Sequence, residues 1–186
     1  TPLVGVSMRP WPSPPPPVPV VIATLKRLRQ EHGIHPVIFP FQHSQDLELS
    51  RSLAQALGSP VSLLEGVYDT PDLQGLIGRM DLVVAMRLHA LIFAATQHVP
   101  MIGLAYDPKV RQFLELVGSP SIELSDVTPP TLDPVVDRLW GTRHDEKQRL
   151  ASVLSPLQER ALETTRHVRR MLYPDRQGPT TATPNS

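Results

Sequence analysis

The sequence contains no cysteine, no long apolar run and no excess of charge of either sign. Without cysteine it can form neither a disulfide framework nor a thiolate metal site, and we expect a cytoplasmic location. No apolar run approaches the roughly 20 residues that span a bilayer, and no signal-peptide pattern is present at residues 1–6. The 18 basic and 18 acidic residues cancel, which argues against a general attraction to nucleic acid or to anionic membranes.

Two glycine-rich patterns that bind phosphate are also missing. The first predicted strand is followed by Met8, Arg9 and Pro10, where a dinucleotide fingerprint would need glycines. No Walker-type glycine and lysine loop occurs anywhere in the chain. The sequence therefore does not favour a nicotinamide dinucleotide or a P-loop nucleotide as its ligand.

Short runs rich in β-branched residues alternate with longer segments of helical period, a pattern that predicts βα units and a parallel sheet. The predicted strands cover residues 3–7, 35–39, 61–64, 81–85, 101–105 and 121–124. We therefore expect an α/β fold with a Rossmann-like, doubly wound, mainly parallel sheet of about six strands, flanked by helices. The proline-rich residues 12–19 suit neither a helix nor a central strand, so we expect a stiff exposed loop there.

The predicted elements divide the chain into three parts. Residues 1–142 should form one Rossmann-like domain, residues 143–173 a helical carboxyl-terminal extension, and residues 174–186 a disordered tail. Ser155, Pro156 and Gln158 have the pattern of a helix start with a capping box, which favours two helices in the extension over one kinked helix. Four basic residues between positions 166 and 170 could touch anionic lipid peripherally, although a solvated helix face is the favoured interpretation.

The chain starts without methionine and enters a strand almost at once. We therefore expect it to be a fragment whose amino-terminal domain is missing. The helices of residues 143–173 are then expected to pack either on the Rossmann-like domain or on that missing domain.

Polar residues follow the predicted strands at one edge of the sheet. In the strand order 3-2-1-4-5-6, strands one and four are neighbours, and ligands bind in the crevice at their carboxyl ends. Arg9 follows strand one and Arg87 and His89 follow strand four, so all three should face this crevice, with Lys109 next to it. Two guanidinium groups and a helix amino terminus suit a compact polyanion such as a phosphorylated carboxylic acid.

Each of these residues also has a purely structural interpretation. Arg87 could cap a helix or pair with Asp81 or Asp107, and His89 could be a core histidine. For Arg9 the alternative is a salt bridge that tethers the proline-rich loop. A lysine in the first turn of an exposed helix, as Lys109 would be, is usually solvated.

Several segments in the right order resemble the polysaccharide pyruvyl transferase family. They are Ala-Met-Arg-Leu-His-Ala-Leu-Ile-Phe-Ala at 85–94, Val-Pro-Met-Ile-Gly-Leu at 99–104, Tyr-Asp-Pro-Lys-Val at 106–110, Val-Gly-Val-Ser-Met-Arg-Pro at 4–10, and the stretch from Phe-Pro-Phe-Gln to Asp at 39–46. The resemblance covers residues 3–118 and matches the start of the carboxyl-terminal, donor-binding domain of these GT-B-like enzymes.

The resemblance implies transfer of pyruvate from phosphoenolpyruvate onto a sugar of a cell-wall or exported polysaccharide, as a cyclic ketal. It implies that Arg9 and Arg87 clamp the donor, that the Leu88 backbone orients it, and that His89 is the general acid or base, with Lys109 nearby. No cofactor and no metal is expected. The acceptor would be a polysaccharide precursor, lipid-linked or free, at the cytoplasmic side of the membrane.

Two other functions stay open at this point. The same crevice could serve a GT-B glycosyltransferase that uses a sugar nucleotide. Alternatively, the domain could be non-catalytic and bind only a glycan or a partner. If the chain is part of an enzyme, we expect the fragment alone to be inactive or nearly so, because only one wall of the interdomain cleft is present.

Overall fold

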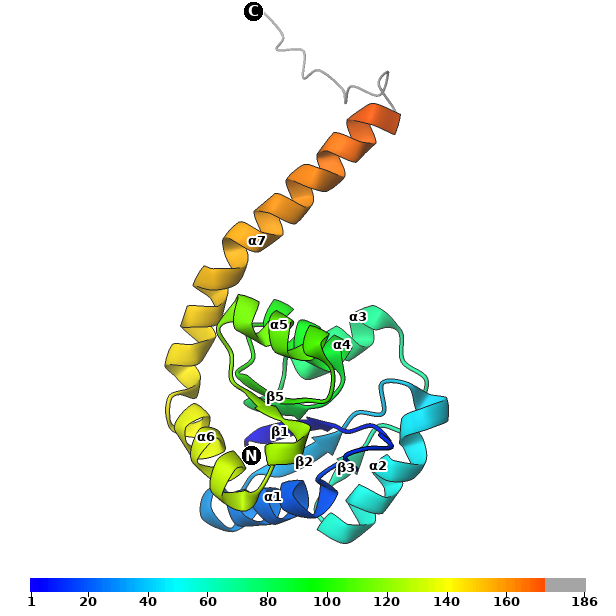
Figure 1. The fold of residues 1–186 in the computed structure, drawn as a ribbon, viewed down its shortest axis with the longest axis vertical. Coiled ribbons are helices and arrows are strands. Elements are labelled where there is room, and N and C mark those ends of the chain that lie inside the picture. Colours follow the sequence, from blue (N-terminus) through cyan, green and yellow to red (C-terminus); the bar gives the residue numbers. More distant parts are fainter. Residues whose placement is uncertain (173–186) are drawn as a thin grey trace, which may run out of the picture.

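Six parallel strands form a single sheet in the order β3-β2-β1-β4-β5-β6 (Figure 1). A computed structural model describes residues 1–172, apart from the side chains of residues 161, 164–170 and 172. The strands are β1 (Leu3–Ser7), β2 (His35–Ile38), β3 (Ser62–Leu63), β4 (Leu82–Ala85), β5 (Met101–Ala105) and β6 (Ser121–Glu123). The predicted α/β class, strand number and strand order are all confirmed, and the sheet is entirely parallel.

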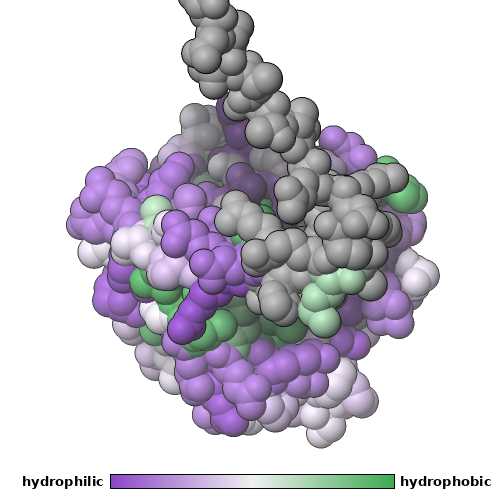
Figure 2. All heavy atoms as spheres, turned by 90° about the horizontal axis from the view of Figure 1, so that it is seen from above, coloured by the Kyte–Doolittle hydropathy of each residue, from purple (hydrophilic) through white to green (hydrophobic). Residues whose placement is uncertain are grey.

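Helices cover both faces of the sheet (Figure 1). On one face lie α1 (Val18–His32), α2 (His43–Leu57) and α6 (Pro129–Gly141), and on the other lie α3 (Thr70–Ile77), α4 (Leu88–Thr96) and α5 (Pro108–Val117). Neighbouring residues of β4 alternate between the faces: Val84 belongs to the core under α1 and α6, whereas Val83 and Ala85 belong to the core under α4 and α5. Seen from above α3–α5, most of the visible surface is hydrophilic, and hydrophobic residues gather near the middle of the view (Figure 2).

The helix ends follow the local sequence. Gly33 ends α1 in the left-handed conformation that glycine adopts without strain. Asp69 and Asp107 cap α3 and α5, each accepting a backbone N–H from the first turn. The predicted proline-rich loop is shorter than expected, because α1 begins at Val18 and includes Pro19. Proline is tolerated in a first helical turn, where its missing N–H has no partner to lose.

An ionic contact joins α1 to α6 on the first face. Arg27 of α1 donates to Asp137 at 2.7 Å and lies 3.5 Å from Asp133, both in α6. Burial lowers the pKa of Arg27, but the hydrogen bond to Asp137 and the nearby carboxylates outweigh it, so that the pKa is raised overall. This contact joins α6, the last helix before the carboxyl-terminal extension, to α1, the first helix of the chain.

The carboxyl-terminal extension is one continuous helix, α7 (Arg143–Leu172), and the prediction of two helices is wrong. Pro156 lies inside α7 and removes one backbone hydrogen bond. Leu150 and Leu154 before the proline are buried against the α4–α5 core and Leu157 after it packs on the same core, so the apolar stripe keeps one helical register.

The last residues of the chain, the boundary near residue 142 and the absence of a membrane span were also predicted from the sequence. The predicted tail at 174–186 lies outside the described residues, as do the side chains of the basic cluster at 166–170. The boundary expected near residue 142 coincides with the junction of α6 and α7, and it stays a prediction that these are separate units. Within residues 1–172, no helix has the length and apolarity to cross a membrane.

Candidate functional site

The site forms where the chain reverses direction across the sheet, between β1 and β4. These strands are paired in parallel register, with Ser7 opposite Ala85. Arg9 and Arg87 each follow two residues later, so their backbones emerge at the same edge of the sheet. This is the edge at which doubly wound folds bind their ligands, as the sequence predicted.

Arg87 is held by a carboxylate that the sequence did not single out. Its Nε and Nη2 atoms donate to the two oxygens of Asp46 at 3.0 and 2.5 Å. Asp46 is completely buried at the start of α2 and also accepts the backbone N–H of Gln42. Further hydrogen bonds run from Nη1 to Gln42 and from Nη2 to Gln45. Arg87 therefore does form an ion pair, as the structural alternative allowed, but its partner is Asp46 and not Asp81 or Asp107.

Arg9 has different partners, on the other side of β4. Its Nη1 donates to the hydroxyl of Tyr106 at 2.9 Å, and its guanidinium lies 4.8 Å from the Tyr106 ring centre and 5.0 Å from that of Trp11. The Nε atom is buried and has no hydrogen-bond partner. Arg9 thus holds the start of the proline-rich loop through Trp11, by cation–π contact and without a described salt bridge.

The two arginines consequently do not share a partner in this structure. Arg87 reaches towards α2, which follows β2, whereas Arg9 reaches towards Tyr106, which follows β5. Their backbones are adjacent, but their guanidinium groups are held on opposite sides of the β1–β4 pair. A joint clamp by Arg9 and Arg87 stays a prediction.

His89 is exposed at the open amino terminus of α4, which excludes the core-histidine alternative. Arg87 is the N-cap residue of this helix and makes no side-chain capping bond. The first intrahelical bond runs from Leu91 N–H to the Arg87 carbonyl. The N–H groups of Leu88, His89 and Ala90 therefore have no partner within the helix and form a donor set suited to an anion.

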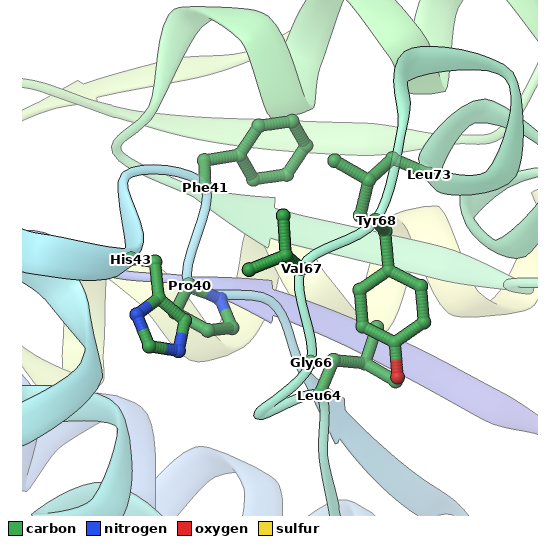
Figure 3. Close-up of a pocket in the computed structure, with 8 residues that line it drawn as sticks. All are labelled: Pro40, Phe41, His43, Leu64, Gly66, Val67, Tyr68 and Leu73. Carbon is green, nitrogen blue, oxygen red and sulfur yellow. The ribbon is translucent and has the colours of Figure 1, made fainter.

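A pocket of about 460 Å³ opens beside Arg87 and His89. Its volume lies within the range of small-molecule sites. One part of the lining is polar and the other is aromatic and aliphatic; the residues are Phe41, Gln42, Tyr68, Thr70, Leu73, Arg87, His89 and Phe93. A smaller cavity of about 80 Å³ shares Phe41, Tyr68 and Leu73 with it (Figure 3).

Lys109 lies outside this pocket. It is exposed in the first turn of α5, and its Nζ is 3.5 Å from the carboxylate of Asp107, the cap of the same helix. This arrangement agrees with the solvated alternative. Among the residues that the structure describes, no group of three histidine or acidic side chains could hold a metal ion.

Sequence reasoning missed the contribution of the segment after β2. Gln42 was not among the predicted site residues, yet it lines the pocket and its side-chain oxygen accepts a hydrogen bond from Arg87. The start of α2 reaches Arg87 because β2 lies next to β1 in the sheet. The stretch at residues 39–46, which carries part of the family resemblance, was the available signal for Gln42 and Asp46.

The fold belongs to the GT-B-like class. A glycotransferase of kitacinnamycin superposes with a TM-score of 0.61 at 17% identity, covering 90% of this chain and 43% of that one. The S. aureus MnaA structure with UDP gives 0.64 at 13% identity, with coverage of 98% and 49%. The carboxyl-terminal CMP-Kdo binding domain of Acinetobacter baumannii WaaA gives 0.58 at 10% identity, with coverage of 83% and 89%. The chain thus spans less than half of the first two and most of the isolated WaaA domain.

Residues 11–108 match the family model for polysaccharide pyruvyl transferases. The match covers more than half of the chain, which therefore belongs to this family and confirms the resemblance. It includes Arg87, Leu88 and His89, whereas Arg9 and Lys109 lie just outside its limits. A search among curated protein sequences finds no match.

Proposed function

We propose that this chain is the donor-binding half of a transferase that moves a pyruvyl group from phosphoenolpyruvate onto a polysaccharide sugar. The observation that carries the proposal is the exposed His89 at the uncapped end of α4, beside Arg87 in a pocket of suitable size. Membership of the family supplies the reaction class.

The donor would bind at the amino terminus of α4. The free N–H groups of Leu88, His89 and Ala90 suit the phosphate or the carboxylate of the donor. Four of the five N–H groups of Arg87 are already used within the protein, so one on Nη1 is left for the donor. Because Asp46 neutralises Arg87, Arg9 and a protonated His89 would supply most of the positive charge.

In the proposed reaction, His89 donates a proton to the methylene carbon of phosphoenolpyruvate, and the central carbon becomes electrophilic. A first sugar hydroxyl adds to that carbon, the carbon–oxygen bond to phosphate breaks, and a second hydroxyl closes the cyclic ketal. Of the two hydroxyl protons released, one restores His89 and the other leaves with phosphate. Proton transfer of this kind contributes about 10²- to 10⁴-fold in rate. The proposal includes no cofactor.

Calorimetry on the 186-residue chain tests the donor. Phosphoenolpyruvate should bind, and Arg9→Met should weaken binding by about 10- to 100-fold, the equivalent of one charge-assisted hydrogen bond. Lys26→Ala removes an exposed positive charge on α1, outside the pocket, and should change nothing. Binding of a uridine or guanosine diphosphate sugar without binding of phosphoenolpyruvate would overturn the proposal in favour of a glycosyltransferase.

Turnover tests the role of His89. In an enzyme that contains both halves, His89→Ala should lower the rate far more than the donor affinity, because the proton is transferred only in the transition state. We expect the present chain alone to turn over slowly or not at all. Unchanged turnover in the His89 variant would remove it from the mechanism, and rapid turnover by this chain alone would contradict the two-half arrangement.

A further inference from the structure

We infer that the pocket holds the pyranose ring of the acceptor sugar as well as the donor, and that an aromatic wall formed by Phe41, Tyr68 and Phe93 binds that ring. This inference rests on the proposed function. It concerns the part of the pocket that the donor does not need.

The aromatic wall is assembled from three separate segments. Phe41 follows β2, Tyr68 lies between β3 and α3, and Phe93 lies in α4. Phe41 and Phe93 support one another as a tilted pair, with ring centres 5.5 Å apart. Tyr68 is 37% exposed, and its ring lies beside Gly66 and Leu64 (Figure 3). All three aromatic residues line the same pocket as Arg87 and His89.

The chemistry of this wall does not suit phosphoenolpyruvate. The face of an aromatic ring carries partial negative charge, so it offers nothing to a small polyanion. A pyranose ring differs, because it combines an apolar face of C–H groups, which pack on aromatic faces, with hydroxyl groups at its edges. Gln42 and Thr70 lie at the polar part of the lining, where they could bond to such hydroxyls.

The volume of the pocket leads to the same inference. Phosphoenolpyruvate has about ten heavy atoms, which take up at most about 300 Å³ if each needs as much room as a water molecule in the liquid. The pocket of about 460 Å³ therefore leaves about 160 Å³ beside the donor. This space suits one face of a pyranose ring, and the rest of the ring would extend out of the open pocket. Since two sugar hydroxyls must reach the central carbon of the donor, a sugar in that space would be correctly placed for reaction.

Gly66 allows Tyr68 to take its position. A Cβ atom at residue 66 would lie 3.2 Å from two ring carbons of Tyr68 and 3.3 Å from its hydroxyl oxygen. Alanine there would therefore press on the ring and shift it. Gly75, in α3, provides a matched control, because a Cβ atom at that position would meet nothing within 4 Å.

The test combines saturation-transfer NMR with calorimetry on the 186-residue chain. The probes are methyl β-galactopyranoside and methyl β-glucopyranoside in the presence of phosphoenolpyruvate, with sorbitol as a polyol that has no ring. We expect transfer to the C–H protons of at least one pyranoside and none to sorbitol. Tyr68→Ala and Phe93→Ala should each weaken pyranoside binding by about 2- to 10-fold, the range for loss of one aromatic contact. Gly66→Ala should act in the same direction and Gly75→Ala should not.

The outcomes separate this inference from the proposed function. If phosphoenolpyruvate does not bind but pyranosides contact the aromatic wall, the proposed donor fails and the sugar site stands. If neither pyranoside receives transfer, or if transfer is equal in wild type and in folded Tyr68 and Phe93 variants, the inference is overturned. Loss of phosphoenolpyruvate binding in folded Tyr68→Ala would also overturn it, since the wall would then serve the donor.

Discussion

Replacement of Asp46 by asparagine should destabilise the protein by about 3 kcal/mol. The carboxylate is fully buried and accepts three hydrogen bonds, two from Arg87 and one from the backbone of Gln42. The asparagine side chain keeps one oxygen, so one guanidinium N–H would face an amide group, a loss of about 1.5–3 kcal/mol. The guanidinium would also lose its counter-charge while only 11% exposed.

Breaking a buried ion pair costs about 3–5 kcal/mol, and the expected loss of about 3 kcal/mol for Asp46→Asn is at the lower end of that range. The lower end applies because Arg87 would keep its bonds to the side-chain amide oxygens of Gln42 and Gln45. For a chain of this length, about 3 kcal/mol corresponds to a fall in Tm of about 6–12 °C. Urea denaturation, followed by circular dichroism, measures the free energy of unfolding directly.

A double-mutant cycle distinguishes the ion pair from a general effect at the site. Arg87→Met removes the cation, and the double variant should be less damaged than the sum of the single changes by at least about 1.5 kcal/mol. Glu48→Gln is the control, because it also removes one negative charge from α2 but at an exposed position; it should hardly change the free energy of unfolding. A cost below about 1 kcal/mol for Asp46→Asn, or additive single changes, would refute the role given to this pair.

Three other substitutions test other parts of the structure. Gly103→Ala should cost about 1–3 kcal/mol, because its Cβ would lie 2.2 Å from a methyl group of Leu114; an unchanged urea midpoint would contradict this packing. Pro156→Ala should raise the helical signal at 222 nm without loss of stability, since proline costs about 3 kcal/mol inside a helix; a fall in either would favour two helices. Tyr106→Phe should cost about 1.5–3 kcal/mol by removing the acceptor for Arg9, and equal stability of the two proteins would argue against that bond.

The site residues show how far sequence reasoning reached. The order of strands placed Arg9, Arg87 and His89 at one edge of the sheet, because the carboxyl ends of parallel strands share an edge. The partner of Arg87 could not be predicted, since Asp46 lies 41 residues away and looks in the sequence like any acid in the first turn of a helix. Its complete burial, which makes it informative, exists only in the folded chain.

The helical extension shows a local signal overruled by packing. Serine, proline and glutamine at 155–158 have the pattern of a helix start, yet the apolar stripe of Leu150, Leu154 and Leu157 docks on one core and keeps α7 continuous. The aromatic wall was missed for a similar reason. Nothing in the separate segments around Phe41, Tyr68 and Phe93 indicates that they meet, because their convergence depends on the strand order and not on spacing.

The sequence by itself thus determined the α/β class, the strand order, the family and the sheet edge at which Arg9, Arg87 and His89 lie, since periodicity, helix caps and short motifs are local properties. Tertiary structure alone decided which side chains pair, which are buried and which rings face one another. Those properties depend on contacts between residues far apart in the chain. For Arg87 they decided that its ion-pair partner is Asp46, and they leave His89 exposed at the open end of α4.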